Sequence, residues 1–105
     1  SFGKTVELST LIHPSVRILL EADETNDSNY VQTLFTYLEC GQNLSDAAKE
    51  MSLHYNTLKY RVNRIISMTG IDLKSEREIF KLMVTEKALK ILDYSSSDQN
   101  VKESK

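Results

Sequence analysis

The sequence contains very few of the residues that interrupt helices or cross-link chains. Its 105 residues include one proline, three glycines, one cysteine and no tryptophan. With so little proline and glycine, long regular helices are expected, and no segment alternates apolar and polar residues for long enough to predict a strand. The single Cys40 excludes an internal disulfide framework and any cysteine-rich metal site. We therefore expect an all-α fold of about five helices.

Long apolar runs and a secretory leader are also lacking. No apolar run exceeds three residues, as in Ile18–Leu20, whereas a membrane-spanning helix needs roughly 20. The first residues, Ser1–Thr5, do not have the basic-then-apolar layout of a signal peptide. The sequence therefore predicts a cytoplasmic protein without a membrane partner.

Acidic residues are missing from one window of the chain, although the whole chain carries a net charge of −2. Between Met51 and Ile71 there is no Asp or Glu, and Lys59, Arg61 and Arg64 contribute +3, so the remainder sums to −5. A basic island on an acidic body is typical of a nucleic-acid footprint. The alternative is that these three cations only form the solvated face of a helix.

Apolar periodicity divides the chain into five predicted helices. Residues 1–12 are expected to connect the domain to an upstream region, 13–94 to form the domain, and 95–105 to be a disordered polar tail. The predicted helices run from 13 to about 24, from 29 to 41, from 44 to 51, from 55 to 69 and from 76 to about 94.

Residues suited to capping lie at the ends of these predicted helices. Gly41 and Gly70 are expected to end the second and fourth helices, because glycine readily adopts the left-handed conformation found there. The candidate N-caps are, in chain order, Ser28 or Asn29, then Asn43 or Ser45, and finally a capping box of Ser75 and Glu78.

The stretch 43–70 predicts a helix-turn-helix, in which a short helix, a three-residue turn and a longer helix cross so that the second can enter a DNA groove. Small side chains allow close crossing, an apolar residue in the turn fills the angle, and apolar residues of the longer helix fix it in place. The residues expected to do this are Ala47, Ala48, Leu53, Leu58 and Val62.

The longer helix has one apolar and one polar face at 100° per residue. Leu58, Val62, Ile65 and Ile66 are expected to point inward, while Lys59 and Arg61 flank the polar face. That face has no carboxylate, whereas a helix built only for solubility more often carries Glu–Lys pairs. Asparagine and arginine make bidentate contacts with base edges, so the face favours DNA binding. Its members are Asn56, Tyr60, Asn63, Arg64 and Ser67.

Several separated motifs resemble one known family. They are Asn43–Met51, His54–Ile65 and Thr69–Leu73, preceded by Thr33–Leu38 and His13–Pro14. Together they are similar to the C-terminal helix-turn-helix domain of PucR-type transcription regulators, a family that includes activators of purine catabolism and of sugar-diacid use. The resemblance covers residues 13 to 92, and a weaker one links residues 48 to 62 with the Fis-type helix-turn-helix.

The resemblance implies a place in a larger bacterial regulator. Such domains follow an upstream sensor domain in the same full-length protein and act as homodimers on two half-sites of double-stranded DNA. Two residues depart from the commonest helix-turn-helix pattern. Ser52 lies where glycine often forms the turn, and Arg61 lies where an apolar residue is frequent.

The Fis-type resemblance and the polar face of the longer helix each indicate candidate DNA-binding residues. The Fis-type resemblance assigns contacts to His54, Tyr55, Thr57, Lys59 and Tyr60, whereas the helical face favours Asn56, Tyr60, Asn63 and Arg64. Groove entry generally uses the N-terminal part of the recognition helix, which favours the earlier residues. For His54 the alternative is helix capping, and for Tyr55 it is partial burial. The candidate set is His54, Tyr55, Asn56, Thr57, Lys59, Tyr60, Arg61 and Arg64.

Signatures of catalysis are lacking. There is no glycine-rich phosphate loop, no spaced set of metal ligands and no nucleophile with a partnering base. We therefore predict no enzyme activity, no cofactor and no metal site, with an inert Cys40 and His13 as a residue at the start of a helix. The alternative function is a helical protein-interaction or dimerisation module that does not bind DNA.

Overall fold

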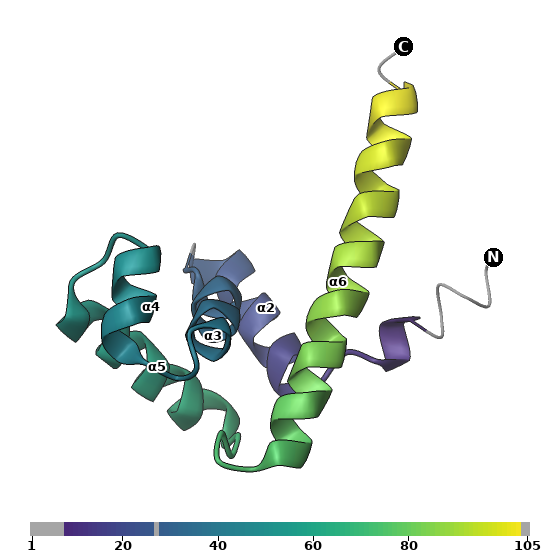
Figure 1. Cartoon of the computed structure of the whole chain (residues 1–105). Helices are drawn as coiled ribbons and strands as arrows, with labels where there is room; N and C mark the ends of the chain where they lie inside the picture. Colours follow the sequence, from purple (N-terminus) through teal and green to yellow (C-terminus); the bar gives the residue numbers. More distant parts are fainter. Residues whose placement is uncertain (1–7, 27, 104–105) are drawn as a thin grey trace.

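The computed structural model describes residues 8–26 and 28–103, and every regular element in that part of the chain is helical (Figure 1). A short helical turn at 8–10 precedes five helices, which confirms the predicted all-α fold. None of these described helices is long and apolar enough to cross a membrane. The helices are α2 (Pro14–Asn26), α3 (Tyr30–Glu39), α4 (Leu44–Glu50), α5 (Tyr55–Thr69) and α6 (Glu76–Glu103).

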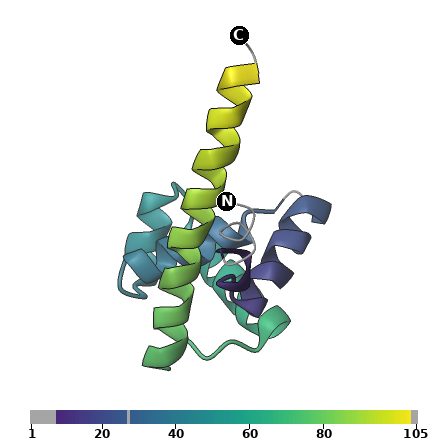
Figure 2. The same ribbon diagram turned by 90° about the vertical axis from the view of Figure 1, so that its right-hand side faces the viewer.

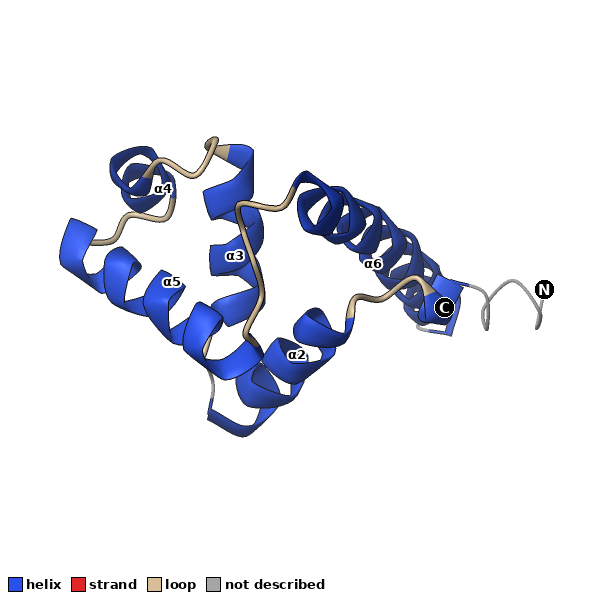
Figure 3. Cartoon of the chain, turned by 90° about the horizontal axis from the view of Figure 1, so that it is seen from below, coloured by secondary structure: helices blue, strands red, loops and turns tan. Residues whose placement is uncertain are grey.

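The helix α3 lies at the centre of the domain and packs against α2, α4 and α5. Viewed from below, α4 and the start of α5 lie on one side of α3, and α6 lies on the other (Figure 3). The C-terminal part of α6 extends well beyond the other helices (Figures 1 and 2). The predicted helix-turn-helix and the last helix therefore occupy opposite sides of the molecule.

Two hydrophobic clusters hold the helices together. The main cluster joins α2, α3, α5 and α6, and its most deeply buried members are Val16, Leu19, Leu34, Ile65 and Leu82. The second, which we call the α4–α5 cluster, consists of Ala47, Ala48, Leu58 and Val62, with Leu53 packed against it. The α4–α5 cluster contains the residues predicted to hold the helix-turn-helix, which confirms that part of the packing.

The N-terminus of α3 is capped by a residue that the sequence did not indicate. Asn29 occupies the N-cap position but makes no side-chain capping bond. Instead, the Asp23 carboxylate accepts from the N–H groups of Tyr30 (2.8 Å) and Val31 (3.1 Å), and from the Ser28 hydroxyl (2.7 Å). A carboxylate suits this position because a helix N-terminus carries partial positive charge. The predicted N-cap position at Asn29 is therefore confirmed, but the side-chain bonds of the cap come from Asp23.

At the start of α6 only half of the predicted capping box forms. The Ser75 hydroxyl accepts from the N–H of Glu78 at 3.3 Å. The Glu78 side chain does not complete the box, because its carboxylate bonds with Nε2 of His13 at 2.8 Å. Glu78, which was expected to complete the capping box, therefore links the start of α2 to α6.

The structure continues α6 to Glu103, beyond its predicted end at Tyr94. No glycine or proline follows Gly70, so no residue of the kind that usually ends a helix is present. The backbone of 95–103 is accordingly helical instead of disordered, and 104–105 lie outside the described residues. Most of the predicted connector, residues 1–7, also lies outside them, and the domain boundaries at 13 and 94 remain predictions.

Candidate nucleic-acid interface

The helix α4 is short, capped and closely packed against α5. Oδ1 of Asn43 accepts from the N–H of Asp46 at 2.9 Å, which confirms Asn43 rather than Ser45 as the cap. Ala47 and Ala48 are 0% and 4% exposed and belong to the same buried cluster as Leu58. Because alanine has no side chain beyond Cβ, the two helix backbones can approach closely at this crossing.

The turn between α4 and α5 is a Schellman motif centred on Ser52. The N–H of Leu53 donates to the carbonyl of Ala48 (2.9 Å), and the N–H of Ser52 donates to that of Lys49 (3.1 Å). These two bonds require a left-handed residue between the helices, and Ser52 has a φ of 56°. Serine therefore adopts here the conformation for which glycine is the usual residue, and the turn geometry is retained.

The inward face of α5 is formed by Leu58, Val62 and Ile65, which are at most 5% exposed. Ile66 was predicted to join them but is 38% exposed. It lies at the edge of the apolar stripe, on a side of α5 where neither α4 nor α3 covers it. At the end of the helix, Gly70 has a φ of 71° and donates its N–H to Ile66, which confirms its predicted role.

The outward face of α5 brings most candidate residues together in solvent. Asn56, Thr57, Lys59 and Arg64 are exposed, and Tyr60 is 64% exposed. Asn63 and Ser67 extend the same face towards the C-terminus. The polar face predicted from the sequence is therefore present and uncovered.

Three candidate residues lie at the margins of this face. Tyr55 is 46% exposed, so it is about half buried, and Arg61 is also partly buried. His54 is exposed at the N-cap position of α5, with extended backbone angles, and its side chain makes no capping bond. His54 therefore occupies the capping position predicted as its alternative role, but its side chain forms no capping bond.

The first N–H groups of α5 have no side-chain cap. The α-helical bonding pattern leaves the first N–H groups of any helix without an internal acceptor. Here Asn56 and Thr57, both exposed, belong to the first turn. Such a terminus is chemically suited to an anion such as a backbone phosphate.

The positive charges of this face are not neutralised within residues 8–26 and 28–93, whose side chains the structure describes. The ion pairs formed there join Glu78 with Lys81 and Glu86 with Lys90, and Glu78 also forms a hydrogen bond with His13. None of them involves Lys59, Arg61 or Arg64, and α5 itself contains no Asp or Glu. The cations of α5 therefore remain available to an external polyanion.

No helix within residues 8–26 and 28–103 covers the exposed face of α5. The N-terminal end of α5 lies next to α4, across the domain from α6 (Figures 1 and 3). Coverage by the last helix would have blocked access to DNA. The face is open, as groove binding requires.

Cys40 lies outside this face, near the end of α3. Burial, followed by the negative charges of Glu50, Asp46 and Glu39, raises the pKa of its thiol. A raised pKa keeps the thiol protonated and therefore a poor nucleophile near neutral pH. The electrostatics agree with the inert role predicted for this cysteine.

A contact that the sequence did not predict links the helix-turn-helix to the loop that follows it. Gln42, directly after Gly41, has a φ of 62°, and its Nε2 donates to the carbonyl of Leu73 at 2.8 Å. The bond joins the α3–α4 turn to the segment between α5 and α6. No local sequence pattern indicates it, because the two residues are 31 positions apart.

A short helix, a left-handed turn and a longer helix with an open, carboxylate-free face define a helix-turn-helix DNA-binding domain. Residues 30–88 match the PucR C-terminal helix-turn-helix domain. The chain therefore belongs to this family, which confirms the resemblance predicted from Asn43–Leu73 and the prediction that the domain is not an enzyme.

Curated relatives support the same family. The chain is 37% identical over 68 residues to the DNA-binding transcriptional activator AdeR of Bacillus subtilis (strain 168), covering 65% of this chain and 16% of AdeR. It is 37% identical over 60 residues to the proline-responsive transcriptional activator PutR of the same organism, covering 57% of this chain and 15% of PutR. The chain thus spans about a sixth of the length of these activators. No solved structure matches it.

Proposed function

We propose that α5 enters the major groove of double-stranded DNA and recognises a specific base sequence, while α4 lies across the DNA backbone. The observation that carries this proposal is the exposed face of α5, which is rich in Asn, Arg and Tyr and has no carboxylate. Helix-turn-helix domains insert the N-terminal part of the second helix most deeply. That part of α5 is the end furthest from α6 (Figure 3).

The side chains of α5 divide between base contacts and phosphate contacts. Asn56 and Arg64 are suited to base edges, because amide and guanidinium groups can make paired hydrogen bonds with adenine and guanine. The remaining candidates, together with the uncapped N–H groups of α5, are suited to phosphate oxygens. These remaining residues are His54, Tyr55, Thr57, Lys59, Tyr60 and Arg61.

The domain acts as the C-terminal part of a larger bacterial transcription regulator in the cytoplasm. Support comes from the family, which is defined as a C-terminal domain, and from relatives about six times as long as the matched segment. We propose that an upstream sensor domain precedes residue 1 and that the full-length protein binds two half-sites as a homodimer.

The test begins with DNA sequences enriched by this chain from a random pool. Binding to the enriched duplex and to unrelated duplexes is then measured by fluorescence anisotropy over a range of salt concentrations. Lys59→Ala is expected to weaken binding to all duplexes alike and to reduce the salt slope by about one, as loss of one phosphate contact predicts. Lys87→Ala, which removes an equally exposed lysine from α6, is the matched control and should change neither quantity.

Two outcomes contradict the proposal. Equal effects of Lys59→Ala and Lys87→Ala would remove α5 from the interface. An absence of binding at low salt and micromolar protein would favour the alternative, a helical protein-interaction module, because non-specific DNA binding is expected near about 1–100 μM.

A further inference from the structure

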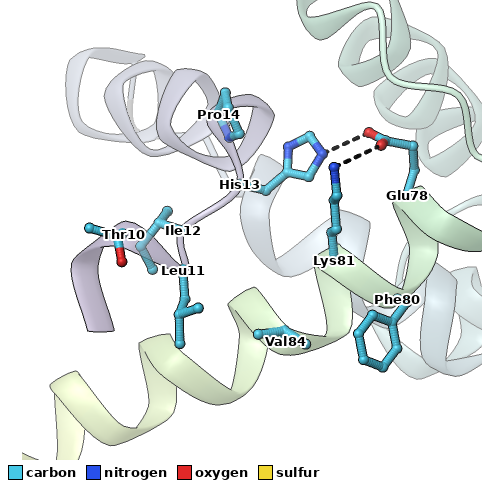
Figure 4. A pocket seen from close by; sticks show the side chains of 9 residues that line it. All are labelled: Thr10, Leu11, Ile12, His13, Pro14, Glu78, Phe80, Lys81 and Val84. Atoms are coloured by element: carbon cyan, nitrogen blue, oxygen red, sulfur yellow. Dashed lines mark hydrogen bonds and ion pairs between the residues drawn. The ribbon is translucent and has the colours of Figure 1, made fainter. Parts of the chain in front are cut away.

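A second surface lies across the domain from α4 and the N-terminal part of α5, on the side of α6 (Figure 3). There the segment 10–14 and the first turns of α6 enclose a groove of about 520 Å³. Leu11 and Pro14 form one wall, and Phe80, Lys81 and Val84 form the other (Figure 4). The DNA-binding role proposed for α5 makes no use of this groove.

The groove continues into an exposed apolar stripe along α6. Phe80, Met83 and Ile91 are 67%, 54% and 51% exposed, and Leu11 beside them is 47% exposed. The spacing of three and eleven residues from Phe80 places the three α6 side chains on one helical face. Contiguous apolar patches of this kind mark protein interaction sites.

The chemistry of this stripe differs from that of the exposed aromatics on α5. Tyr55 and Tyr60 carry hydroxyl groups that can bond with phosphates or bases. Phe80 and Ile91 have no polar atom, and Met83 has only a weakly accepting thioether. These side chains contribute nothing to contact with a polyanion. Their burial against an apolar protein surface is favourable.

Buried hydrogen bonds fix the walls of the groove. The His13 N–H donates to Oγ1 of Thr85 (2.9 Å), and the single proton of the Thr85 hydroxyl is shared between the carbonyls of Leu11 and Lys81, each at 3.0 Å. Nδ1 of His13 accepts from the N–H of Ser15 (3.0 Å), so the imidazole proton lies on Nε2 and is donated to Glu78. Thr85 is fully buried. The groove is therefore preformed, which reduces the entropic cost of docking.

We propose that this groove and the adjoining stripe dock the part of the full-length regulator that precedes this domain. The proposal rests on the larger regulator proposed above. The family places this domain at the C-terminus, and the chain spans about a sixth of its relatives, so a long polypeptide reaches the domain beside Leu11. Covalent attachment through a short linker gives the preceding part a millimolar effective concentration at the groove.

Charge further defines the occupant and disfavours a second copy of this domain. Lys81 pairs with Glu78 at the groove (3.8 Å), whereas the exposed Lys87 on the stripe has no ion pair among the side chains described, so a carboxylate of the partner surface facing Lys87 is complementary. Lys87 falls between Phe80 and Ile91 within the stripe, so pairing two α6 helices along this face would bring two lysines together. Like charges at such close range oppose self-association. The occupant is therefore an apolar surface of the upstream part with acidic residues at its rim.

The test measures the accessibility of the stripe in two forms of the protein. Phe80→Cys is introduced, in a Cys40→Ser background, into this chain and into the full-length regulator, and alkylation by a bulky maleimide is followed by mass spectrometry. Labelling should be severalfold slower in the full-length protein, since a millimolar effective concentration of the tethered part favours the covered state of the surface. The matched control, Ile66→Cys on α5, should label equally fast in both forms.

Each outcome has a defined meaning. Equal Phe80→Cys labelling in both forms would overturn the proposal, and so would slowing in the isolated chain as its concentration rises, which indicates a second copy instead. Introducing Leu11→Glu into the full-length Phe80→Cys protein should restore the fast rate. DNA binding by the isolated Phe80→Cys chain is measured separately, so loss of the proposed function is distinguished from failure of docking.

Discussion

The helices α5 and α6 each bury one stripe, but they present different chemistry to solvent. α5 contributes Leu58 and Val62 to the α4–α5 cluster and Ile65 to the main cluster, so it joins both. α6 contributes to the main cluster alone. The exposed side of α5 has polar and cationic side chains without acids, whereas that of α6 combines charges of both signs with apolar residues.

The two helices are also attached in different ways. α5 is held by apolar packing on α3 and α4, and the polar side chains of its exposed face form none of the hydrogen bonds that hold Thr69 at its C-terminal end. α6 is held in addition by polar bonds from its Thr85 and Glu78 to the segment before α2. The exposed polar face of α5 can therefore be offered to a ligand, whereas part of the polar surface of α6 is used to fix the segment before α2.

The largest expected effect concerns the packing of the two helices. Leu58→Ala and Leu82→Ala each remove a side chain that is 0% exposed, so each should lower the free energy of unfolding by about 2–5 kcal/mol. Urea denaturation measures both changes. If Leu82→Ala lowered the free energy of unfolding by less than about 1 kcal/mol, α6 would contribute little to the main cluster, and the two helices would not be comparable in packing.

The next effect sharpens the difference between the exposed faces. Asn56→Ala should relax base preference at one position of the recognised site, at a cost of about 1–3 kcal/mol for the preferred base and little for others. Competition binding with single-base variants of the enriched duplex measures this. The matched change on α6, Lys90→Ala, should leave the preference profile unaltered. A uniform loss for every duplex would instead assign Asn56 to a phosphate.

Much of this fold could be predicted from local sequence pattern. The boundaries of α5, the caps at Asn43 and Gly70, and the packing of Ala47 and Leu58 all follow from helical periodicity and end residues. The open polar face followed in the same way, because periodicity determines which residues share a side of a helix.

The features that the sequence did not predict depend on distant partners. Asp23 caps α3 from the preceding helix, and Glu78 bonds with His13 across 65 positions. Ile66 satisfies the helical period, yet no neighbouring helix covers it. Periodicity gives the direction of a side chain, but only the tertiary arrangement decides what it meets.

A smaller effect is expected where α6 meets the incoming chain. Thr85→Val keeps the shape of the side chain but removes the hydroxyl that bonds with His13 and Leu11. A buried N–H without a partner costs about 1–3 kcal/mol, which urea denaturation should detect, while DNA affinity of the folded chain stays the same. Thr25→Val is the control, since the Thr25 hydroxyl bonds only with Glu21 on the surface of α2. Equal effects of both changes would refute a buried polar clamp.

The smallest effects are expected at the two Schellman turns that flank α4. Substitutions at these two turns should change the free energy of unfolding in opposite directions. Gly41 and Ser52 occupy equivalent left-handed positions, with φ values of 65° and 56°. Ser52→Gly should therefore raise the free energy of unfolding by about 0.5–1 kcal/mol, because a left-handed serine costs about 1–2 kcal/mol and glycine adds some unfolded-state entropy. Gly41→Ala should lower it by a similar amount through φ alone, since a Cβ there meets no atom within 4 Å.

If Ser52→Gly proved destabilising in urea, the turn before α5 would depend on the serine hydroxyl rather than on backbone conformation. In that case the orientation of α5 would rest on a side chain that makes no bond among the described contacts of this turn.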